Sequence, residues 1–178
     1  REIYHHRYQI LDALALEPGM VVADVGAGTG FFSLMFADAV GPNGHVHAVD
    51  ISPTFVGALM ERAAADGFGN LTGVVNEPRD VRLAPSSIDL AFISDAYHHF
   101  EYPHETLRSI RDALRPGGAL VIIDFRRIPG VSSGWVMSHV RAGADIVLME
   151  VASAGFELVE RRDFMPTQYY LRFRKADE

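Results

Sequence analysis

The chain has 178 residues, of which 48% are hydrophobic and 22% charged, a balance typical of one ordinary globular domain. The 23 acidic side chains outnumber the 16 Lys and Arg, and the net charge of −7 disfavours a nucleic-acid partner, which requires a basic face. The absence of cysteine excludes disulfide bonds, thiolate catalysis and cysteine-based zinc sites. No apolar run is long enough to span a membrane. We expect a cytoplasmic protein, although a chain that begins at Arg1 rather than Met leaves a removed N-terminal targeting segment open.

Apolar periodicity predicts alternating helices and strands along the chain. In chain order, the predicted elements are a helix over 4–16, a strand over 20–25, a helix over 31–40, a strand over 45–49, a helix over 54–65, strands over 71–75 and 89–94, a helix over 105–114, a strand over 119–125, a helix over 139–154, and strands over 157–161 and 169–174. This alternation is typical of an α/β fold with a mostly parallel sheet and helices on both faces. The last two strands are joined by a short turn through Pro166, so we expect them to form an antiparallel hairpin.

The turn after the first strand contains three glycines, in the segment Asp24-Val25-Gly26-Ala27-Gly28-Thr29-Gly30. Glycines accept φ > 0 and let the backbone approach a ligand closely. Ligands of open α/β sheets bind beyond the carboxyl ends of the strands, so this turn is the predicted cofactor site. Phe31 stands where the dinucleotide fingerprint has its third glycine, and this bulky side chain would crowd a pyrophosphate.

An acidic residue, Asp50, follows the second strand, twenty residues after Gly30. A carboxylate at the tip of this neighbouring strand can accept hydrogen bonds from both hydroxyls of a ribose. The glycine turn and Asp50 together therefore predict a ligand that has a ribose but no pyrophosphate.

Four segments, in family order, resemble the motifs of class I S-adenosylmethionine-dependent methyltransferases. Residues 23–30 resemble motif I, 49–52 resemble the acidic motif II, 94–100 are similar to the Ala-Leu-His-His-Phe stretch of many small-molecule methyltransferases, and 114–120 resemble the late Leu-Lys/Arg-Pro-Gly-Gly motif. The resemblance implies a Rossmann-like sheet of seven strands, mostly parallel with a C-terminal antiparallel hairpin. It also implies S-adenosyl-L-methionine as the cofactor and S-adenosyl-L-homocysteine as the product.

The same resemblance implies where the cofactor would lie. The glycines would lie under the methionyl and ribose parts, Asp50 would bind the ribose hydroxyls, and Ile51 would flank the adenine. The loop over 76–80 corresponds to the segment that reads the adenine amino group, but it departs from the family because Glu77 replaces an Asp and Pro78 lacks the N–H of an Ala. The predicted cofactor residues are Asp24, Gly26, Ala27, Gly28, Gly30, Asp50, Ile51, Glu77, Pro78 and Ser94.

Methyl transfer from a sulfonium requires an acceptor that is positioned against the methyl group and, if the acceptor carries a proton, a base. Asp95, His98 and His99 follow the fourth strand and are the predicted catalytic residues, since histidine is the most usable base near neutral pH. Adjacent side chains on an extended segment face opposite ways, so we expect one histidine in the cleft and one in a structural role. His98 is slightly favoured for the cleft.

The predicted substrate contacts are Tyr4 and His5, from an opening helix that acts as a lid, with Tyr97 and Arg126. For Arg126, a solvated turn is an equally good interpretation, and Phe31 and Phe32 are most simply core residues. We expect no metal site, because His5, His6 and His139 would have to converge with the pair after the fourth strand from separate segments, and this chemistry needs no metal.

The predicted organisation is one methyltransferase domain over 1–178, with an opening helix or lid over 1–17, a cofactor-binding core over 20–125, and a substrate-side segment with the hairpin over 126–178. The favoured function is methyl transfer to O, N or C of a small molecule, with quinone-ring methyltransferases nearest in motif style. Arsenite methylation by the cysteine-dependent route is excluded. The alternatives are a non-catalytic S-adenosylmethionine-binding module and a dinucleotide-dependent oxidoreductase. The sequence predicts neither the acceptor nor the oligomeric state.

Overall fold

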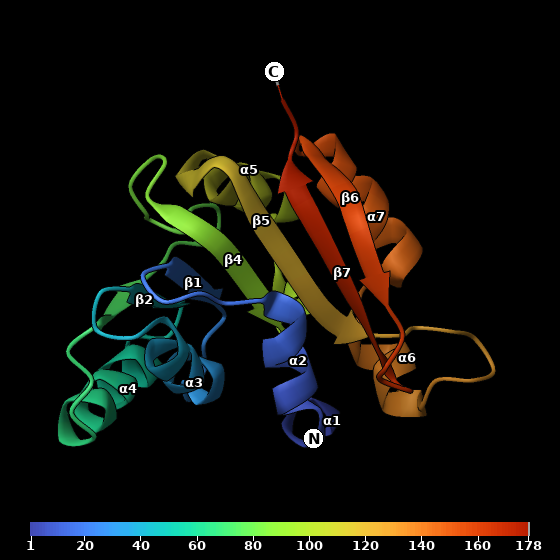
Figure 1. The fold of residues 1–178 in the computed structure, drawn as a ribbon. Helices are drawn as coiled ribbons and strands as arrows, with labels where there is room; N and C mark the ends of the chain where they lie inside the picture. The colour runs from blue at the N-terminus through green and yellow to red at the C-terminus, as the bar shows by residue number, and fades with distance from the viewer. Residues whose placement is uncertain (178) are drawn as a thin grey trace.

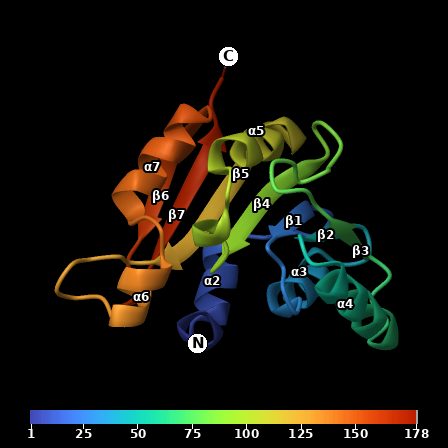
Figure 2. The same ribbon diagram turned by 180° about the vertical axis from the view of Figure 1, so that it is seen from behind.

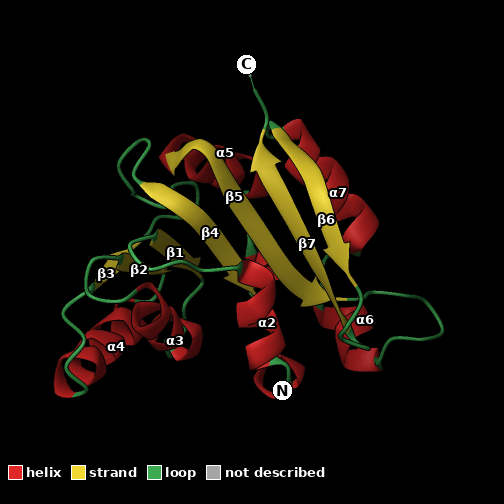
Figure 3. Ribbon diagram, viewed as in Figure 1, coloured by secondary structure: helices red, strands yellow, loops and turns green. Residues whose placement is uncertain are grey.

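The computed structural model describes residues 1–177 and contains a seven-stranded sheet (Figures 1 and 3). Its strands are β1 (Val21–Val25), β2 (His45–Asp50), β3 (Leu71–Val75), β4 (Ile88–Ser94), β5 (Leu114–Phe125), β6 (Phe156–Arg162) and β7 (Gln168–Lys175). The strand order across the sheet is β3-β2-β1-β4-β5-β7-β6. The first five strands run parallel, whereas β7 is antiparallel to both β5 and β6. The predicted mostly parallel sheet with an antiparallel C-terminal hairpin is therefore confirmed.

Helices cover both faces of this sheet, as the two opposite views show (Figures 1 and 2). The helices are α1 (Glu2–His5), α2 (Arg7–Leu14), α3 (Phe31–Val40), α4 (Pro53–Ala65), α5 (Pro103–Ala113), α6 (Gly134–His139) and α7 (Ala144–Ser153), with a 3₁₀ helix, η1 (Tyr97–His99). Side chains of α2, α3 and α4 belong to the core on one face, and those of α5 and α7 belong to the core on the other. No helix within residues 1–177 combines the length and apolar character that crossing a bilayer requires.

The central strands read as continuous apolar runs because both of their faces are covered. In β5, Val121 and Ile123 pack into the core under α2, α3 and α4, whereas Leu120 and Ile122 pack into the core under α5 and α7. All four side chains are fully buried. Successive side chains of a strand point to opposite faces, so only a strand between two helical layers needs apolar residues at every position.

Three predicted elements differ from those observed. The opening helix is divided at His6 into α1 and α2, and the helix expected over 139–154 is divided into α6 and α7. The Ser133 hydroxyl accepts a hydrogen bond from the Val136 N–H at 3.3 Å and begins α6 well before the expected start, while extended backbone at Gly143 separates it from α7. The fifth strand begins earlier than expected, because Leu114 already pairs with Ile88 of β4.

The order of the strands determines where a ligand can enter. β1 lies between β2 and β4, so the chain leaves β1 toward one edge for β2 and β3 and later returns to the other side for β4 and β5. Such a reversal leaves a crevice at the carboxyl ends of the two central strands, which is the usual ligand site of open α/β sheets.

A buried acid, Asp24, joins β1 to α3 beside this crevice. Its side chain is only 4% exposed and accepts a hydrogen bond from the Ser33 hydroxyl at 2.6 Å. Burial raises the pKa of Asp24 from 3.8 to about 6, against the opposing effect of the Ser33 hydrogen bond and with a further increase from the charge of Asp50. The folded chain therefore holds a proton on Asp24 more tightly than the unfolded chain does.

Asp24→Asn should change the pH dependence of stability. Because the folded-state pKa is raised, the contribution of Asp24 is fully present below pH 3.8 and is lost as pH rises through about 6. This loss amounts to about 2 kcal/mol between about pH 4.5 and 8. Asparagine keeps an oxygen acceptor for Ser33 but does not ionise, so the unfolding free energy of the variant relative to the parent should increase by that amount over this range. Urea unfolding at the two pH values measures it, and a pH-independent difference would contradict the assignment.

Candidate functional site

A cavity of about 810 Å³ opens at the carboxyl ends of β1, β2 and β4, beside α1. Of the predicted site residues, those that line it are Tyr4, Asp24, Gly26, Ala27, Gly28, Asp50, Ile51, Pro78, Ser94, Asp95 and His99. Those that do not line it are His5, Gly30, Glu77, Tyr97, His98 and Arg126. The structure thus brings most of the predicted cofactor residues and two of the three predicted catalytic residues to one cavity.

The glycine turn lies flat against the end of β2. The N–H groups of Gly26 and Ala27 both donate to the Val49 carbonyl, at 2.8 and 3.0 Å. Gly28 has φ +54, a conformation that side chains disfavour, and a Cβ added to it would meet no atom within 4 Å. The space beside Gly28 is therefore free for a ligand to approach the backbone.

The other two glycines are required by packing. A Cβ on Gly26 would lie 2.4 Å from the Cβ of Ala96, and a Cβ on Gly30 would lie 2.0 Å from a methyl group of Leu59 in α4. Gly30 therefore contributes to the site by letting α3 begin close to α4, not by facing the cavity.

Asp50 is held in a fixed orientation at the end of β2. One carboxylate oxygen accepts the Gly28 N–H at 2.8 Å, and the other accepts the Ser52 N–H at 2.9 Å. A carboxylate offers about four lone-pair positions. Two acceptor positions therefore remain for hydroxyl groups of a ligand, as the ribose interpretation requires.

Apolar and unpaired polar groups complete the cofactor side. Ile51 is 57% exposed and Phe55 is 47% exposed, and both line the cavity, where they offer apolar surface to the flat ring of a nucleobase. The Ser94 hydroxyl is buried without a hydrogen-bond partner within residues 1–177, a state that a ligand group would relieve. Sequence reasoning missed Phe55, because its position in α4 carries no motif.

The predicted adenine loop contributes only in part. Pro78 lines the cavity, but the Glu77 carboxylate points to an exposed ion pair with Arg82 at 3.8 Å, and the Glu77 backbone pairs with that of Asp80. The cause is the tight turn through Pro78, which directs Glu77 away from the cavity.

Asp95 follows β4 in a strained conformation. Its φ is +52, in the left-handed region, which is energetically unfavourable for any residue that has a side chain. Its carboxylate accepts a hydrogen bond from the side-chain amide of Gln168 in β7. Burial, followed by the charge of Asp124, raises the pKa of Asp95 to about 6. Nothing in the sequence indicated that Gln168 contacts Asp95, because it lies 73 residues further along the chain.

The positions expected for the two adjacent histidines are reversed. His98 is buried, and its Nδ1 lies 2.8 Å from the Asp124 carboxylate, whereas His99 lines the cavity. The expectation assumed an extended segment, but residues 97–99 form the 3₁₀ helix η1, in which neighbouring side chains do not alternate. The two rings instead lie 4.0 Å apart between centroids.

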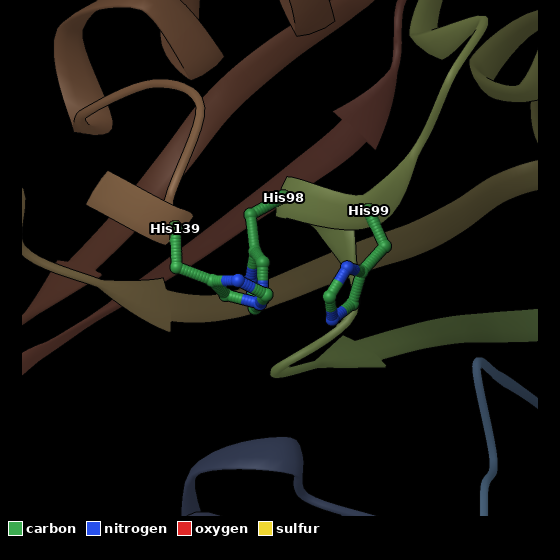
Figure 4. A group of neighbouring side chains, drawn as sticks. All are labelled: His98, His99 and His139. Carbon is green, nitrogen blue, oxygen red and sulfur yellow. The ribbon is translucent and has the colours of Figure 1, made fainter. Parts of the chain in front are cut away.

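His99 is the histidine available to a ligand. Partial burial of its ring lowers its pKa, and the neighbouring His98 and His139 lower it further. At neutral pH its imidazole is therefore uncharged and can accept a proton. His139 also reaches this place from α6 (Figure 4), whereas His5 and His6 are not part of the group. The expectation that histidines from separate segments would not converge is thus wrong for His139.

Two predicted substrate residues are used by the fold. The Tyr97 hydroxyl donates to Glu150 at 2.7 Å, and the side chain is buried. The Arg126 guanidinium binds Asp163 at 2.6 Å and the Gln168 carbonyl at 3.0 Å, which ties β5 to the hairpin. Neither Tyr97 nor Arg126 lines the cavity.

The N-terminal helix covers part of the cavity. Tyr4 of α1 packs against Phe31, with ring centroids 5.4 Å apart, and both line the cavity. Phe31 and Phe32 are both cavity residues as well as helix residues, and Phe32 is also buried in the core, as expected. The Glu2 carboxylate accepts hydrogen bonds from the N–H and hydroxyl of Thr167, at 3.0 and 2.6 Å, and so fastens α1 to the loop before β7.

Comparisons with known proteins agree with this geometry. The model of the family described as "Methyltransferase domain" matches residues 16–163. A ubiquinone/menaquinone biosynthesis C-methyltransferase of Hydrogenovibrio crunogenus is 28% identical over 66% of this chain and 47% of its own length. An arsenite methyltransferase of Halobacterium salinarum is 29% identical over 62% of this chain and 28% of its own length. The chain therefore spans about half, or less, of these curated relatives.

Solved structures show the same fold. A SAM-dependent methyltransferase from Aquifex aeolicus superposes with a TM-score of 0.87, over 95% of this chain and 89% of that one, at 21% identity. The [4+2]-cyclase SpnF superposes with a TM-score of 0.82, over 97% of this chain and 81% of that one, at 18% identity. With a family model that matches most of its length and a glycine turn and acid built as that family requires, the chain belongs to the methyltransferase domain family, as a class I S-adenosylmethionine-dependent domain.

Proposed function

We propose that this chain transfers the methyl group of S-adenosylmethionine to an O, N or C atom of a small molecule. The observation that carries the proposal is that one cavity contains both the glycine turn with Asp50 and, beyond Ser94, the polar side chains of Asp95 and His99. Catalysis of this displacement depends on holding two reactants in line, so a single cavity with a cofactor side and a polar acceptor side is what the reaction needs.

The residues present fit the cofactor. Gly28 leaves space for it, Asp50 has free acceptor positions for the ribose hydroxyls, and Ile51 with Phe55 offers apolar surface to the adenine. When bound, S-adenosylmethionine supplies an electrophilic methyl group on its sulfonium. The chain's own residues would orient the acceptor against that methyl and hold its proton.

His99 is the proposed base. Its ring lines the cavity and its lowered pKa keeps it uncharged at neutral pH, so that it can take a proton from an acceptor hydroxyl or amine. Asp95 is a second proton acceptor, fixed in orientation by Gln168. An acceptor that arrives as an anion would need neither.

The relatives support a small acceptor without identifying it. One acts in quinone biosynthesis and another on arsenite, according to their names. The present chain has no cysteine, so a route that relies on cysteine ligands to arsenic is not open to it. We infer an organic acceptor that enters beside α1, with quinone-like rings as the first class to test.

Two other functions remain as alternatives. The superposition with a [4+2]-cyclase is a reminder that this fold need not transfer a methyl group, and a module that binds the cofactor without turnover would use the same turn and acid. A dinucleotide oxidoreductase is disfavoured by the glycine spacing and by Phe31, which packs against Tyr4 at the place where a pyrophosphate would approach.

S-adenosylhomocysteine should stabilise the fold, and NAD should not. At a ligand concentration a hundredfold above the dissociation constant, binding adds about 2.7 kcal/mol, which raises Tm by about 5–10 °C for a chain of this size. Thermal melts with each ligand separate the two cofactor assignments. A larger shift with NAD would overturn the one proposed here.

Asp50→Ala should weaken cofactor binding about 30- to 1000-fold, since hydrogen bonds to a charged group contribute roughly 1.5–3 kcal/mol each and water replaces them only in part. The substitution also removes the hydrogen-bond acceptor of the Gly28 N–H, which can destabilise the turn. The Tm of the variant is therefore measured as well as its affinity for S-adenosylhomocysteine, which calorimetry gives. Asp50→Asn is the matched control for the turn, because it keeps one oxygen acceptor. Unchanged cofactor affinity in a folded Asp50→Ala protein would show that Asp50 does not bind the ribose.

His99→Ala should slow single-turnover methyl transfer about 10²- to 10⁴-fold while the cofactor affinity stays the same, if the acceptor must lose a proton. The acceptor is first selected by screening quinones, phenols and amines for release of S-adenosylhomocysteine. His104→Ala serves as the control, because that side chain lies on α5, contacts the Ser153 carbonyl at 3.4 Å and does not line the cavity. An equal rate for His99→Ala and the parent would place the base elsewhere.

A further inference from the structure

Three histidines from two distant segments converge at the edge of the cavity. His98 and His99 belong to η1, and His139 is the last residue of α6 (Figure 4). The ring centroid of His139 lies 5.3 Å from that of His98 and 5.1 Å from that of His99. One ring nitrogen of each residue lies within 4.8 Å of the corresponding atom of the other two.

The buried member of the group is oriented by a carboxylate. Nδ1 of His98 lies 2.8 and 3.1 Å from the two oxygens of Asp124, and the His98 backbone N–H donates to the same carboxylate at 3.0 Å. Asp124 also accepts the Phe125 N–H at 2.8 Å and is itself only 1% exposed. This environment favours the tautomer with its proton on Nδ1, so that Nε2 carries a lone pair.

The remaining ring nitrogens of the group have no protein partner. Within residues 1–177, no hydrogen bond occupies Nε2 of His98 or either ring nitrogen of His99 and His139. Histidine–carboxylate pairs with a free outer nitrogen are the usual arrangement of metal-ligating histidines, because the carboxylate fixes the ring and raises its basicity.

We propose that His98, His99 and His139 form a binding site for one divalent transition-metal ion, of which zinc is the probe of choice. Three imidazoles with an open fourth position are a known zinc arrangement, and imidazole ligands favour zinc, copper, nickel or iron over magnesium and calcium. This site departs from the expectation that the chain binds no metal.

The geometry requires only small movements. Tetrahedral zinc with Zn–N bonds of 2.0–2.1 Å holds its ligand nitrogens about 3.3 Å apart, so nitrogens now within 4.8 Å need to approach by at most about 1.5 Å. His99 and His139 are exposed, so their rings can rotate, while His98 stays fixed by Asp124.

The site would place a Lewis acid beside the cavity, because His99 belongs to both. A ring nitrogen of His99 that binds zinc has no lone pair left for a proton, so in the zinc-bound chain Asp95, which also lines the cavity, would be the proton acceptor. A metal ion there can orient an oxygen or nitrogen atom of the acceptor and lower the pKa of its proton. This consequence rests on the proposed function, whereas the metal site itself does not.

Zinc binding is therefore tested on the metal-free chain alone, without cofactor or acceptor. Calorimetric titration should give one Zn²⁺ per chain with a dissociation constant in the micromolar range or below, and Mg²⁺ should give no heat. Trp135 is the chain's one tryptophan, and its ring stacks on His139 with centroids 4.6 Å apart, so its fluorescence should change over the same titration. A stoichiometry other than one, or a response to Mg²⁺ equal to that to Zn²⁺, would overturn the proposal.

Single substitutions measure how much each residue contributes to zinc affinity. His139→Ala removes an exposed ligand that the core does not need, and should weaken zinc binding more than Asp124→Asn, for which loss of the orienting carboxylate predicts a 10- to 100-fold weakening. His6→Ala, which removes a partly exposed histidine outside the group, should leave zinc affinity unchanged. The melting temperature of each variant confirms that it is folded. Parental affinity in His139→Ala, or an equal loss in His6→Ala, would contradict the site, and neither result would bear on cofactor binding.

Discussion

The close approach of two loops at the centre of the sheet is the constraint on which the site depends. Gly26, directly after β1, lies so near Ala96, after β4, that a single added carbon atom would be 2.4 Å from the Ala96 Cβ. The contact brings the cofactor turn and the segment with the candidate catalytic residues together at the carboxyl ends of the central strands. Parallel pairing of β1 with β4 sets this approach, because it aligns the carboxyl ends of both strands.

On either side of that contact, backbone groups do most of the positioning. Val49 accepts two N–H groups of the glycine turn, and Asp50 accepts a third from Gly28. On the acceptor side, Asp124 plays the same part for η1 by accepting the backbone N–H of His98 as well as its ring. Two carboxylates near the carboxyl ends of β2 and β5, the parallel strands on either side of the central pair β1 and β4, thus hold the two loops between which a substrate would lie.

The sequence predicted the secondary structure of this molecule better than its side-chain contacts. All seven strands were predicted, and the bounds 31–40 and 71–75 agree with α3 and β3. The central strands were the clearest, since strands covered on both faces leave short, unambiguous apolar runs. The reversed positions of His98 and His99 had a local cause, because a short 3₁₀ helix has no apolar pattern that distinguishes it from extended chain. Gln168 could not be found from sequence, as it reaches Asp95 only through the antiparallel pairing of β7 with β5. Asp124, in contrast, stands near the carboxyl end of a parallel strand, and the rule that revealed Asp50 could have revealed it too.

The attachment of α1 to the loop before β7 has a consequence for the timing of a catalytic cycle. This four-residue helix buries one side chain, Ile3, and is fastened mainly by the hydrogen bonds of Glu2 with Thr167. Segments with so few buried contacts open at a small fraction of the cost of global unfolding. We therefore expect ligands to exchange by local detachment of α1 while the sheet stays intact, and in that case the lifetime of the attached state would limit how fast product leaves.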